Sequence, residues 1–200
     1  MDSSTSGPTG GLKFKVLIVG EDEVGKTSLI IRFVENRFED SSSPKTLGDF
    51  ITTKLDLFGV PIQIQIQDVT RAIDWEESVP FFVEDNDGIL LILDMSSKAK
   101  MKLYLDYWLK SIRDHNQEIP VLVVGNKSDL PKKVNLNKTA QYASKFGSNF
   151  IETSAKTGEN VSYAFKLLTS EIVKQKAAAK KRSEGKRTDG LDSIFNRYDI

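Results

Sequence analysis

The strongest constraint on the fold is the segment GEDEVGKT at residues 20–27, which follows the apolar run VLIV at residues 16–19. An apolar run, a glycine-flanked turn and an amphipathic segment predict a strand, a loop and a helix. The spacing G-x-x-x-x-G-K-[ST] predicts that backbone N–H groups of the loop surround a phosphate group of a nucleotide. Lys26 would then supply a cation to the β- and γ-phosphates, and Thr27 a ligand to Mg²⁺. Nucleotide binding is the leading hypothesis, and a glycine-rich turn without a ligand is the alternative.

Composition is typical of one globular domain. The chain has 200 residues, of which 39% are hydrophobic, and this is enough for one core with flanking tails. The 28 basic and 28 acidic residues cancel, so the net charge favours neither nucleic acid nor an anionic membrane as a partner. The absence of cysteine excludes disulfides, thiolate metal sites and a cysteine nucleophile. The sequence has no signal-peptide pattern and no apolar run of roughly 20 residues, so we expect a soluble, cytoplasmic protein.

Strand and helix patterns alternate through the rest of the chain. Isoleucine alternates with glutamine at residues 62–67, after a turn predicted at Gly59-Val60-Pro61, and this indicates an antiparallel hairpin with one polar face. Residues 88–94 and 121–125 are continuous apolar runs, as expected for the middle strands of a parallel sheet. Helical patterns occupy residues 29–36, 101–115, 137–146 and 160–179, with a last short strand at residues 149–153. This order predicts an α/β doubly wound sheet with its ligand at the carboxyl ends of the strands.

The composition changes at both ends of the chain. Residues 1–11 are small and polar and are expected to form a disordered tail. We therefore place the globular domain at residues 12–174. Residues 175–200 begin with many lysines and are expected to form a flexible basic tail, which is either a solvated linker or a weak contact to anionic lipid.

The loop NKSD at residues 126–129 directly follows the second buried run, where a doubly wound sheet holds its ligand. Asp129 can accept hydrogen bonds from both N1–H and the 2-amino group of guanine, a charge-assisted pair that adenine cannot form. Asn126 would brace this loop and contact the edge of the base, and the stem of Lys127 would cover one face of the ring. A plain turn after a strand is the alternative interpretation.

A second loop, ETSAK at residues 152–156, follows the last predicted strand. The hydroxyl of Ser154 and the backbone N–H of Ala155 would reach guanine O6. Three ligand-facing loops in one α/β chain therefore favour a guanine nucleotide over an adenine nucleotide.

These loops resemble the phosphate loop, NKxD and SAK motifs of the Ras superfamily of small GTPases, and the resemblance covers residues 12–174. Within the superfamily the chain is most similar to the Rab branch, because of TLGDF at residues 46–50 and DGILLILD at residues 87–94. The resemblance implies a P-loop NTPase fold, with a six-stranded, mostly parallel sheet, one antiparallel edge strand and about five helices. It also implies GTP or GDP with Mg²⁺ as ligands, effector, exchange and activating proteins as partners, and a monomer.

The resemblance further implies a set of site residues. The nucleotide-binding residues are Glu23, Val24, Gly25, Lys26, Thr27, Ser28, Phe38, Thr46, Asn126, Lys127, Asp129, Leu130, Ser154, Ala155 and Lys156. The metal ligands are Thr27, Thr46 and, through a water molecule, Asp68, and the catalytic candidates are Lys26 and Arg71. Phe38 would pack against the edge of the guanine, with an ordinary core contact as the alternative.

The motif that positions the attacking water departs from the family. The family has Asp-x-x-Gly-Gln, in which the aspartate holds the Mg²⁺ shell, the glycine N–H contacts the γ-phosphate and the glutamine orients the water. Asp68 is retained, but Arg71 stands at the glycine position and Ala72 at the glutamine position. Slow intrinsic GTP hydrolysis is therefore predicted. A further hypothesis is that the guanidinium of Arg71 reaches the γ-phosphate, and a solvated arginine is its alternative.

The first switch has two possible alignments. Without a gap, Lys45 stands seven residues after Phe38, at the position of the family threonine that ligates Mg²⁺, whereas a shift of one residue places Thr46 there. We favour Thr46, since the string that it begins resembles the Rab sequence better. If Lys45 fills the position, this loop does not coordinate Mg²⁺.

The phosphate loop and the tail also depart from the Rab pattern. Residues 21–23 are three consecutive acids, which predict weakened nucleotide affinity and faster release, and Glu23 is expected to hinder glycine-type backbone angles. A chain without cysteine cannot be prenylated, so no stable lipid anchor is expected, and any membrane association would be peripheral.

Three functions follow from these observations. The first is a Rab-like small GTPase with slow or partner-assisted hydrolysis. The second is a pseudo-GTPase that binds GTP without useful turnover, as Arg71 and Ala72 suggest. The third is a P-loop ATPase or kinase, against which Asp129 argues.

Overall fold

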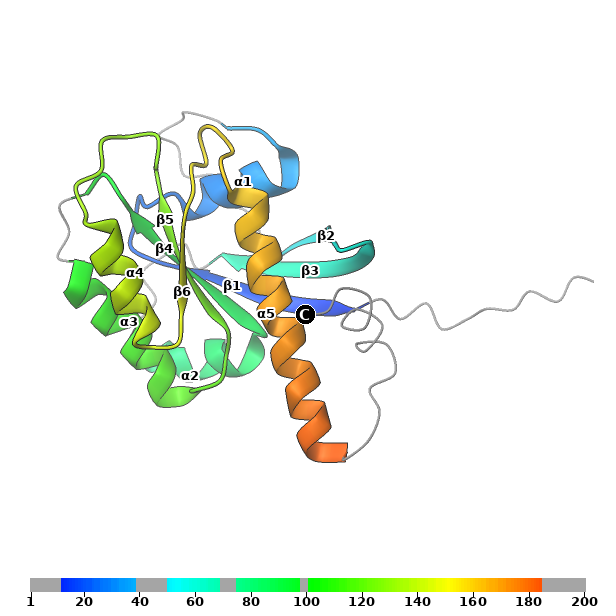
Figure 1. Ribbon diagram of the computed structural model, residues 1–200. Coiled ribbons are helices and arrows are strands. Elements are labelled where there is room, and N and C mark those ends of the chain that lie inside the picture. The colour runs from blue at the N-terminus through cyan, green and yellow to red at the C-terminus, as the bar shows by residue number, and fades with distance from the viewer. Residues whose placement is uncertain (1–11, 39–49, 69–74, 98–100, 185–200) are drawn as a thin grey trace, which may run out of the picture.

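The computed structural model describes residues 12–38, 50–68, 75–97 and 101–184 (Figure 1). The strands are β1 (Lys13–Val19), β2 (Ile51–Leu57), β3 (Val60–Asp68), β4 (Gly88–Asp94), β5 (Val121–Asn126) and β6 (Asn149–Glu152). The helices are α1 (Lys26–Glu35), α2 (Trp75–Asp85), α3 (Met101–His115), α4 (Leu136–Ser144) and α5 (Val161–Glu184). Within these ranges, no helix is both long and apolar enough to cross a bilayer.

The six strands form one sheet in the order β2-β3-β1-β4-β5-β6. β2 pairs antiparallel with β3, from Ile51 opposite Ile66 to Leu57 opposite Val60, and every other pair of neighbours is parallel. The predicted α/β fold, with a six-stranded sheet and one antiparallel edge strand, is confirmed. The carboxyl ends of the five parallel strands lie at one edge of the sheet, where the loops that follow them come close together. These are the loops after β1, β3, β4, β5 and β6.

Helices cover both faces of the sheet and create two hydrophobic cores. One core packs α1 and α5 against the sheet, and the other packs α2, α3 and α4 against the opposite face. Along β4, Leu90 and Ile92 belong to the first core, whereas Ile89 and Leu91 belong to the second. Since successive side chains of a strand point to opposite faces, a strand covered on both sides must be apolar throughout. This explains the continuous apolar runs in the sequence.

The hairpin between β2 and β3 turns one residue earlier than predicted. Phe58 and Gly59 form the turn, with φ of 53° and 81°, whereas Val60 and Pro61 already belong to β3. Positive φ at both central residues gives a two-residue turn whose twist matches that of the strands. The prediction of a turn at Gly59-Val60-Pro61 was therefore wrong in position, because Pro61 is paired with Asp56 in the ladder.

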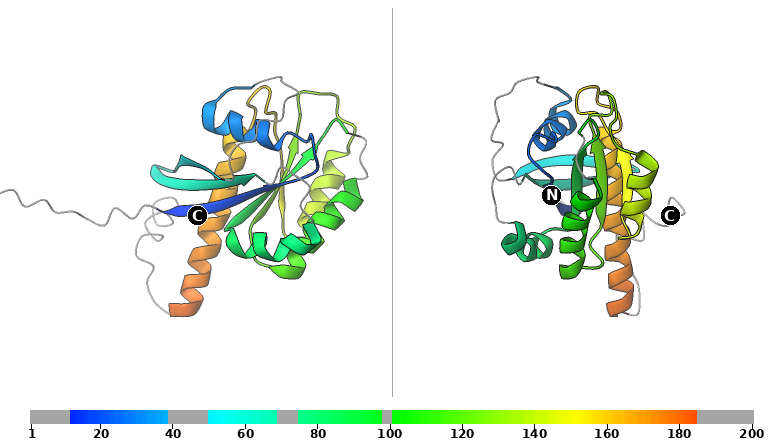
Figure 2. Two further views of the ribbon diagram at one scale, coloured as in Figure 1. Left: turned by 180° about the vertical axis from the view of Figure 1, so that it is seen from behind. Right: turned by 90° about the vertical axis from the view of Figure 1, so that its left-hand side faces the viewer.

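Two helices differ from the sequence patterns. The pattern analysis missed α2, since Pro80 lies inside it and proline normally ends a helix. α5 continues to Glu184, beyond the domain boundary expected at residue 174, and projects past the sheet (Figure 2). Ala177 in this extension is buried, which explains why the helix does not end earlier. The tail expected at residues 1–11 lies outside the described residues. The tail expected at residues 175–200 is helical up to Glu184, and residues 185–200 lie outside the described part of the chain.

Candidate functional site

The phosphate loop connects β1 to α1, and its two glycines are required by their neighbours. Gly20 has φ of 149°, and a Cβ there would lie 2.5 Å from the carbonyl oxygen of Ile92. Gly25 has φ of 95°, and a Cβ there would lie 2.4 Å from Nδ2 of Asn126. Both distances are too short for any side chain, so the backbone of the loop packs directly against β4 and the base loop.

Glu23 adopts the left-handed conformation that we expected it to hinder. Its φ is 62°, a region that costs a non-glycine residue about 1–2 kcal/mol. The carbonyl oxygen of Glu23 accepts a hydrogen bond from Nζ of Lys127 at 2.7 Å, which helps to hold this conformation. The acid at this position therefore strains the loop.

Lys26 is folded back over the phosphate loop. Only 6% of the residue is exposed, and Nζ donates to the carbonyl oxygens of Gly20 and Glu21, both at 2.8 Å. Burial lowers the pKa of Lys26, and the carboxylate of Asp68 is the strongest influence that opposes this shift. The ammonium group is thus held at the opening of the loop, close to the start of α1, where free backbone N–H groups favour an anion.

Thr27 and Asp68 meet between the start of α1 and the end of β3. The hydroxyl of Thr27 donates to Oδ2 of Asp68 at 2.8 Å. Burial raises the pKa of Asp68, while the hydrogen bond from Thr27 and the charge of Lys26 lower it. Oδ1 of Asp68 is buried and has no hydrogen-bond partner among the described residues. A buried, unpaired carboxylate oxygen beside a hydroxyl is a suitable donor set for Mg²⁺ and its bound water.

The described parts of the chain contain no group of three or more His, Cys, Asp or Glu side chains that could hold a metal. Thr27 and Asp68 would hold a Mg²⁺ ion together with water and a phosphate, which this ion commonly keeps as ligands.

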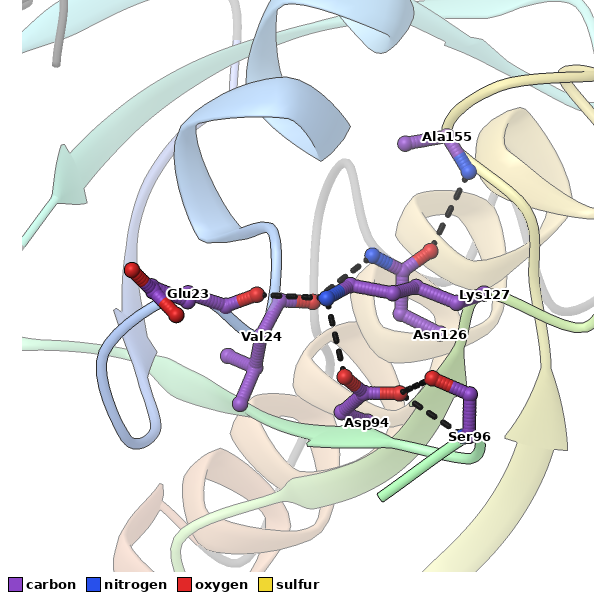
Figure 3. Close-up of polar contacts among 7 residues, drawn as sticks. All are labelled: Glu23, Val24, Asp94, Ser96, Asn126, Lys127 and Ala155. Atoms are coloured by element: carbon purple, nitrogen blue, oxygen red, sulfur yellow. Dashed lines mark hydrogen bonds and ion pairs between the residues drawn. The ribbon is translucent and has the colours of Figure 1, made fainter. Parts of the chain in front are cut away.

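Asn126 links three loops of the site (Figure 3). It lies at the end of β5 and is 1% exposed. Its Nδ2 donates to the carbonyl oxygen of Val24 at 2.9 Å, and its Oδ1 accepts from the backbone N–H of Ala155 at 3.1 Å. The hydroxyl of Thr153 also approaches Oδ1, at 3.4 Å. The phosphate loop and the last loop are therefore fixed to the NKSD loop by one amide side chain.

Lys127 adds a second link between the NKSD loop and the phosphate loop, and it also contacts the end of β4 (Figure 3). Besides the carbonyl of Glu23, its Nζ contacts Oδ2 of Asp94 at 2.8 Å. The other oxygen of Asp94 accepts from the hydroxyl and the backbone N–H of Ser96, both at 2.7 Å. Burial by itself would raise the pKa of Asp94, but the hydrogen bonds from Lys127 and Ser96 outweigh it and hold this pKa below its ordinary value. Lys127 thus joins β4, β5 and the phosphate loop.

Asp129 and Ser154 come from two loops and touch each other. The hydroxyl of Ser154 donates to Oδ1 of Asp129 at 2.6 Å and accepts from the backbone N–H of Thr157 at 3.1 Å. Asp129 is exposed, whereas Ser154 is fully buried. The structure therefore uses the proton of Ser154 to orient Asp129, and it uses the N–H of Ala155 to hold Asn126. In this arrangement the two donors predicted for guanine O6 are bonded to Asp129 and Asn126.

The other predicted residues surround these contacts. Val24 is buried, Ser28 is half-buried, and Leu130 and Lys156 are exposed. Phe38 is half-buried against the core of α1 and α5, which is the core contact named as its alternative role. The predicted residues Thr46, Arg71 and Ala72, and the alternative Lys45, lie outside the described residues.

Sequence reasoning missed residues that support the site from behind. Arg32 of α1 donates from Nε to the carbonyl of Ala155 at 2.8 Å and from Nη2 to that of Lys156 at 2.7 Å. Asp94 had a detectable signal, since it is a polar residue at the carboxyl end of a buried strand. Arg32 had none, because only the packing of α1 beside the last loop brings it there.

The sequence matches known proteins over nearly the whole described domain. The model of the Ras family matches residues 15–174. Ras-related protein Rab-21 of Mus musculus is 30% identical over 175 residues, which cover 86% of this chain and 78% of the relative. Rab-21 of Homo sapiens is also 30% identical to this chain over 175 residues, which cover 86% of this chain and 77% of the relative. Ras-related protein Rab-26 of Bos taurus is 32% identical over 163 residues, which cover 80% of this chain and 63% of the relative.

The fold, the phosphate loop and these similarities agree. The doubly wound sheet, the GEDEVGKT loop and the NKSD loop all lie within or beside the region matched by the Ras family model. This chain belongs to the Ras family and is a Rab-like small GTPase.

Proposed function

We propose that this Rab-like protein is a guanine-nucleotide switch that binds GTP and GDP with Mg²⁺ and hydrolyses GTP slowly or only with the help of a partner. The observation that carries the proposal is the pair of hydrogen bonds from Asn126 to Val24 and Ala155. They hold a phosphate loop and a base-binding loop at fixed distance, as one nucleotide spanning both would require. The alternative is a pseudo-GTPase that keeps its nucleotide as a structural ligand.

Guanine selection is assigned to Asp129. Its carboxylate would accept from N1–H and the 2-amino group of the base, while Ser154 holds it from the other side. Adenine offers no such pair of donors, so the aspartate would remain unpaired against it, and this difference favours guanine. Asn126, Lys127, Ala155 and Leu130 would support or line the base, and Phe38 would contribute only through the core beneath it.

The phosphates are assigned to the start of α1. Lys26, the backbone N–H groups from Glu23 to Gly25, and Ser28 would bind the β- and γ-phosphates. Thr27 would ligate Mg²⁺ directly and Asp68 through water, with Thr46 as a further ligand from the first switch. When bound, Mg²⁺ neutralises charge that develops on the phosphate oxygens during hydrolysis. Lys26 supplies positive charge to the same oxygens.

Slow hydrolysis is inferred from Arg71 and Ala72. A methyl group at position 72 cannot orient the attacking water, and a side chain at position 71 crowds the backbone N–H that would contact the γ-phosphate. Retention of Asp68 favours a functioning metal site over a fully degenerate one. Arg71 as a cation in contact with the γ-phosphate stays a second hypothesis for this step.

The acidic phosphate loop is expected to have a modest effect on affinity. Glu21, Asp22 and Glu23 are all exposed, so water and salt screen their repulsion of a polyphosphate. We therefore propose somewhat faster nucleotide release than in other small GTPases. A dissociation half-time of hours in the presence of Mg²⁺ would contradict this.

The partners proposed by family membership are effector, exchange and activating proteins. Residues 39–50 and 69–82 are the segments proposed to change between nucleotide states, and most of them lie outside the described residues. A peripheral membrane contact through the basic residues after Lys174 is proposed with them.

The first test identifies the ligand. The purified protein is denatured and the released nucleotide is separated by chromatography, and guanine nucleotide is expected. The Asp129→Ala variant should then bind GDP at least about tenfold more weakly, since two charge-assisted hydrogen bonds are lost. Asp114→Ala, which removes an exposed carboxylate at the end of α3, is the control and should bind GDP normally. Preferential release of adenine nucleotide would overturn the proposal.

The second test measures hydrolysis in a single turnover. The wild-type protein loaded with GTP should form GDP slowly, and Ala72→Gln should accelerate the reaction by restoring an amide at the water-orienting position. Arg71→Ala should leave the rate unchanged if the arginine is solvated, whereas a fall would assign it to the γ-phosphate. If neither the wild type nor Ala72→Gln hydrolyses GTP, even with an activating protein, the pseudo-GTPase alternative replaces the proposal.

A further inference from the structure

The hydroxyl of Tyr104 lies directly beneath the phosphate loop. Tyr104 belongs to α3 and is 8% exposed. Its hydroxyl donates to the carbonyl oxygen of Ile92 in β4 at 2.8 Å and accepts from the backbone N–H of Glu21 at 3.0 Å. One side chain of α3 therefore connects β4, in the middle of the sheet, to the residue that follows Gly20 in the phosphate loop.

The space around this hydroxyl explains why the contact is specific. A Cβ on Gly20 would lie 3.0 Å from the hydroxyl oxygen of Tyr104 and 2.5 Å from the carbonyl oxygen of Ile92. The end of β1, the backbone of β4 and the tyrosine hydroxyl thus share one tightly filled volume. This packing restricts the backbone conformation of the phosphate loop at Gly20, where the loop begins.

Glu21 is held from two sides by its peptide groups. Its N–H is bonded to Tyr104, and its carbonyl oxygen accepts from Nζ of Lys26 at 2.8 Å. Any rotation of this residue would move one of the two carbonyl oxygens that hold the ammonium group of Lys26. Tyr104 therefore acts on the phosphate-binding lysine through one intervening residue, without touching a ligand itself.

We propose that Tyr104 is a positioning residue for nucleotide binding, which holds the phosphate loop in its binding conformation before the nucleotide arrives. This inference rests on the proposed function. If a loop becomes ordered only when its ligand binds, the lost conformational entropy weakens the affinity. A loop that is already ordered before binding avoids this loss. Burial raises the pKa of Tyr104 far above the usual range, so the hydroxyl keeps the proton that it donates to Ile92 at every working pH.

The test is Tyr104→Phe, which removes only the hydroxyl. The ring stays against Trp108, with 6.1 Å between ring centroids, so the variant is expected to fold. Release of a fluorescent GDP analogue in the presence of Mg²⁺ should be roughly tenfold faster than from the wild type, equivalent to about 1.4 kcal/mol. Hydrogen–deuterium exchange should also become faster at the backbone N–H of Glu21.

Two control variants separate positioning from stability. Ile112→Val shortens a fully buried side chain of the same helix, so it should lower the thermal midpoint but leave GDP release within twofold of the wild type. Tyr163→Phe removes the hydroxyl of a tyrosine that is 58% exposed and should change neither property. Release from Tyr104→Phe within twofold of the wild type would overturn the inference, as would equal acceleration by Ile112→Val.

The outcome is distinguishable from a failure of the proposed function. If the wild type binds no guanine nucleotide, the proposed function fails and the inference about nucleotide positioning fails with it. If the wild type binds GDP and Tyr104→Phe releases it at the same rate, only the inference fails. Unchanged exchange at Glu21 in a variant with faster release would also overturn it, because the loop would then not have been held by the hydroxyl.

Discussion

Single side chains and single glycines fix the relative positions of the loops in this protein. Asn126 bonds to Val24, 102 positions away in the sequence, and a Cβ on Gly25 would lie 2.4 Å from Nδ2 of the same side chain. The phosphate loop has no room for a Cβ at Gly25, so any side chain at this position would displace the amide group of Asn126.

Gly25→Ala should therefore disrupt the site. The new Cβ would lie 2.4 Å from Nδ2 of Asn126 at a φ of 95°, so we expect the free energy of unfolding to fall by about 2–4 kcal/mol and nucleotide binding to be lost. Urea unfolding and bound-nucleotide content measure the two effects. Gly147→Ala is the control, because φ there is 65° but nothing lies within 4 Å of the new Cβ, and it should cost only about 1–2 kcal/mol. Equal losses in both variants would contradict the role of Asn126.

Asp94→Asn should remove a pH-dependent part of the stability. The hydrogen bonds of Asp94 hold its pKa below the ordinary value of 3.8, so its stabilising contribution is present above that pH and is lost as the pH falls through the lower, folded-state value. The free energy of unfolding of the variant should be about 1 kcal/mol below that of the wild type at neutral pH. This difference should disappear in acid, and urea unfolding over a pH series would detect it.

The same Asp94→Asn substitution should also be measured in a protein that already carries Lys127→Gln. Because Lys127 is bonded to Asp94 at 2.8 Å, the effect of Asp94→Asn should be smaller when Lys127 is already replaced. A difference between wild type and Asp94→Asn that persists unchanged in strong acid, or that is the same in both backgrounds, would show that the ion pair is not its source.

Among the secondary-structure elements, α2 contains a residue that is unfavourable for a helix, Pro80. Pro80 is the sixth residue of α2, past the first turn in which proline is tolerated. It removes one hydrogen bond to a carbonyl four residues earlier. Val79 and Val83 are nevertheless buried against the second core, and this packing maintains the helix despite the proline.

Pro80→Ala should stabilise α2. We expect the free energy of unfolding to rise by about 1–2 kcal/mol, since the missing helical hydrogen bond is restored. The thermal midpoint should rise by about 2–8 °C for a domain of this size. Pro131→Ala, at an exposed position after β5, is the control and should change the stability by less than about 0.5 kcal/mol. A decrease in stability of Pro80→Ala would show that proline is favourable at this position.

Over the full length of the domain, α5 sets where the folded region ends. The helix packs against β2, β4 and β5, and its last turns carry the ion pairs of Lys176 with Asp87 at 2.6 Å and Arg182 with Glu118 at 2.9 Å. The pair of Arg182 with Glu118 is largely exposed and that of Lys176 with Asp87 is partly exposed, so each contributes little, whereas the buried side chain of Ala177 adds apolar contact. The end of α5 is therefore part of the folded domain.

A chain ending at Lys174 should be less stable than a chain ending at Glu184. The shorter chain loses the contact of Ala177 and both ion pairs, and we expect its free energy of unfolding to be about 1–2 kcal/mol lower. The chain ending at Glu184 should match the full chain within about 0.5 kcal/mol. Urea unfolding of the three proteins measures this, and equal stability of all three would return the domain boundary to residue 174.

The sequence predicted the features that depend on local spacing. The glycine spacing at residues 20–27 predicts a loop between a strand and a helix, and the apolar run at residues 88–94 predicts a strand covered on both faces. It could not predict α2, because Pro80 obscures the helical pattern, or the end of α5, because burial of Ala177 depends on what the helix packs against. The turn at Phe58 and Gly59 was misplaced, since a phenylalanine with positive φ has no signature in the sequence.

Spacing and apolar periodicity were enough to predict the α/β sheet, its antiparallel edge strand and the Ras-family resemblance, because they are local properties of the chain. How the loops support one another depends instead on the three-dimensional arrangement of the strands. The order of the strands brings Tyr104 beneath Glu21, Lys127 to Asp94 and Asn126 to Val24. These contacts join residues far apart in the sequence, so they exist only once the sheet has aligned the carboxyl ends of its strands.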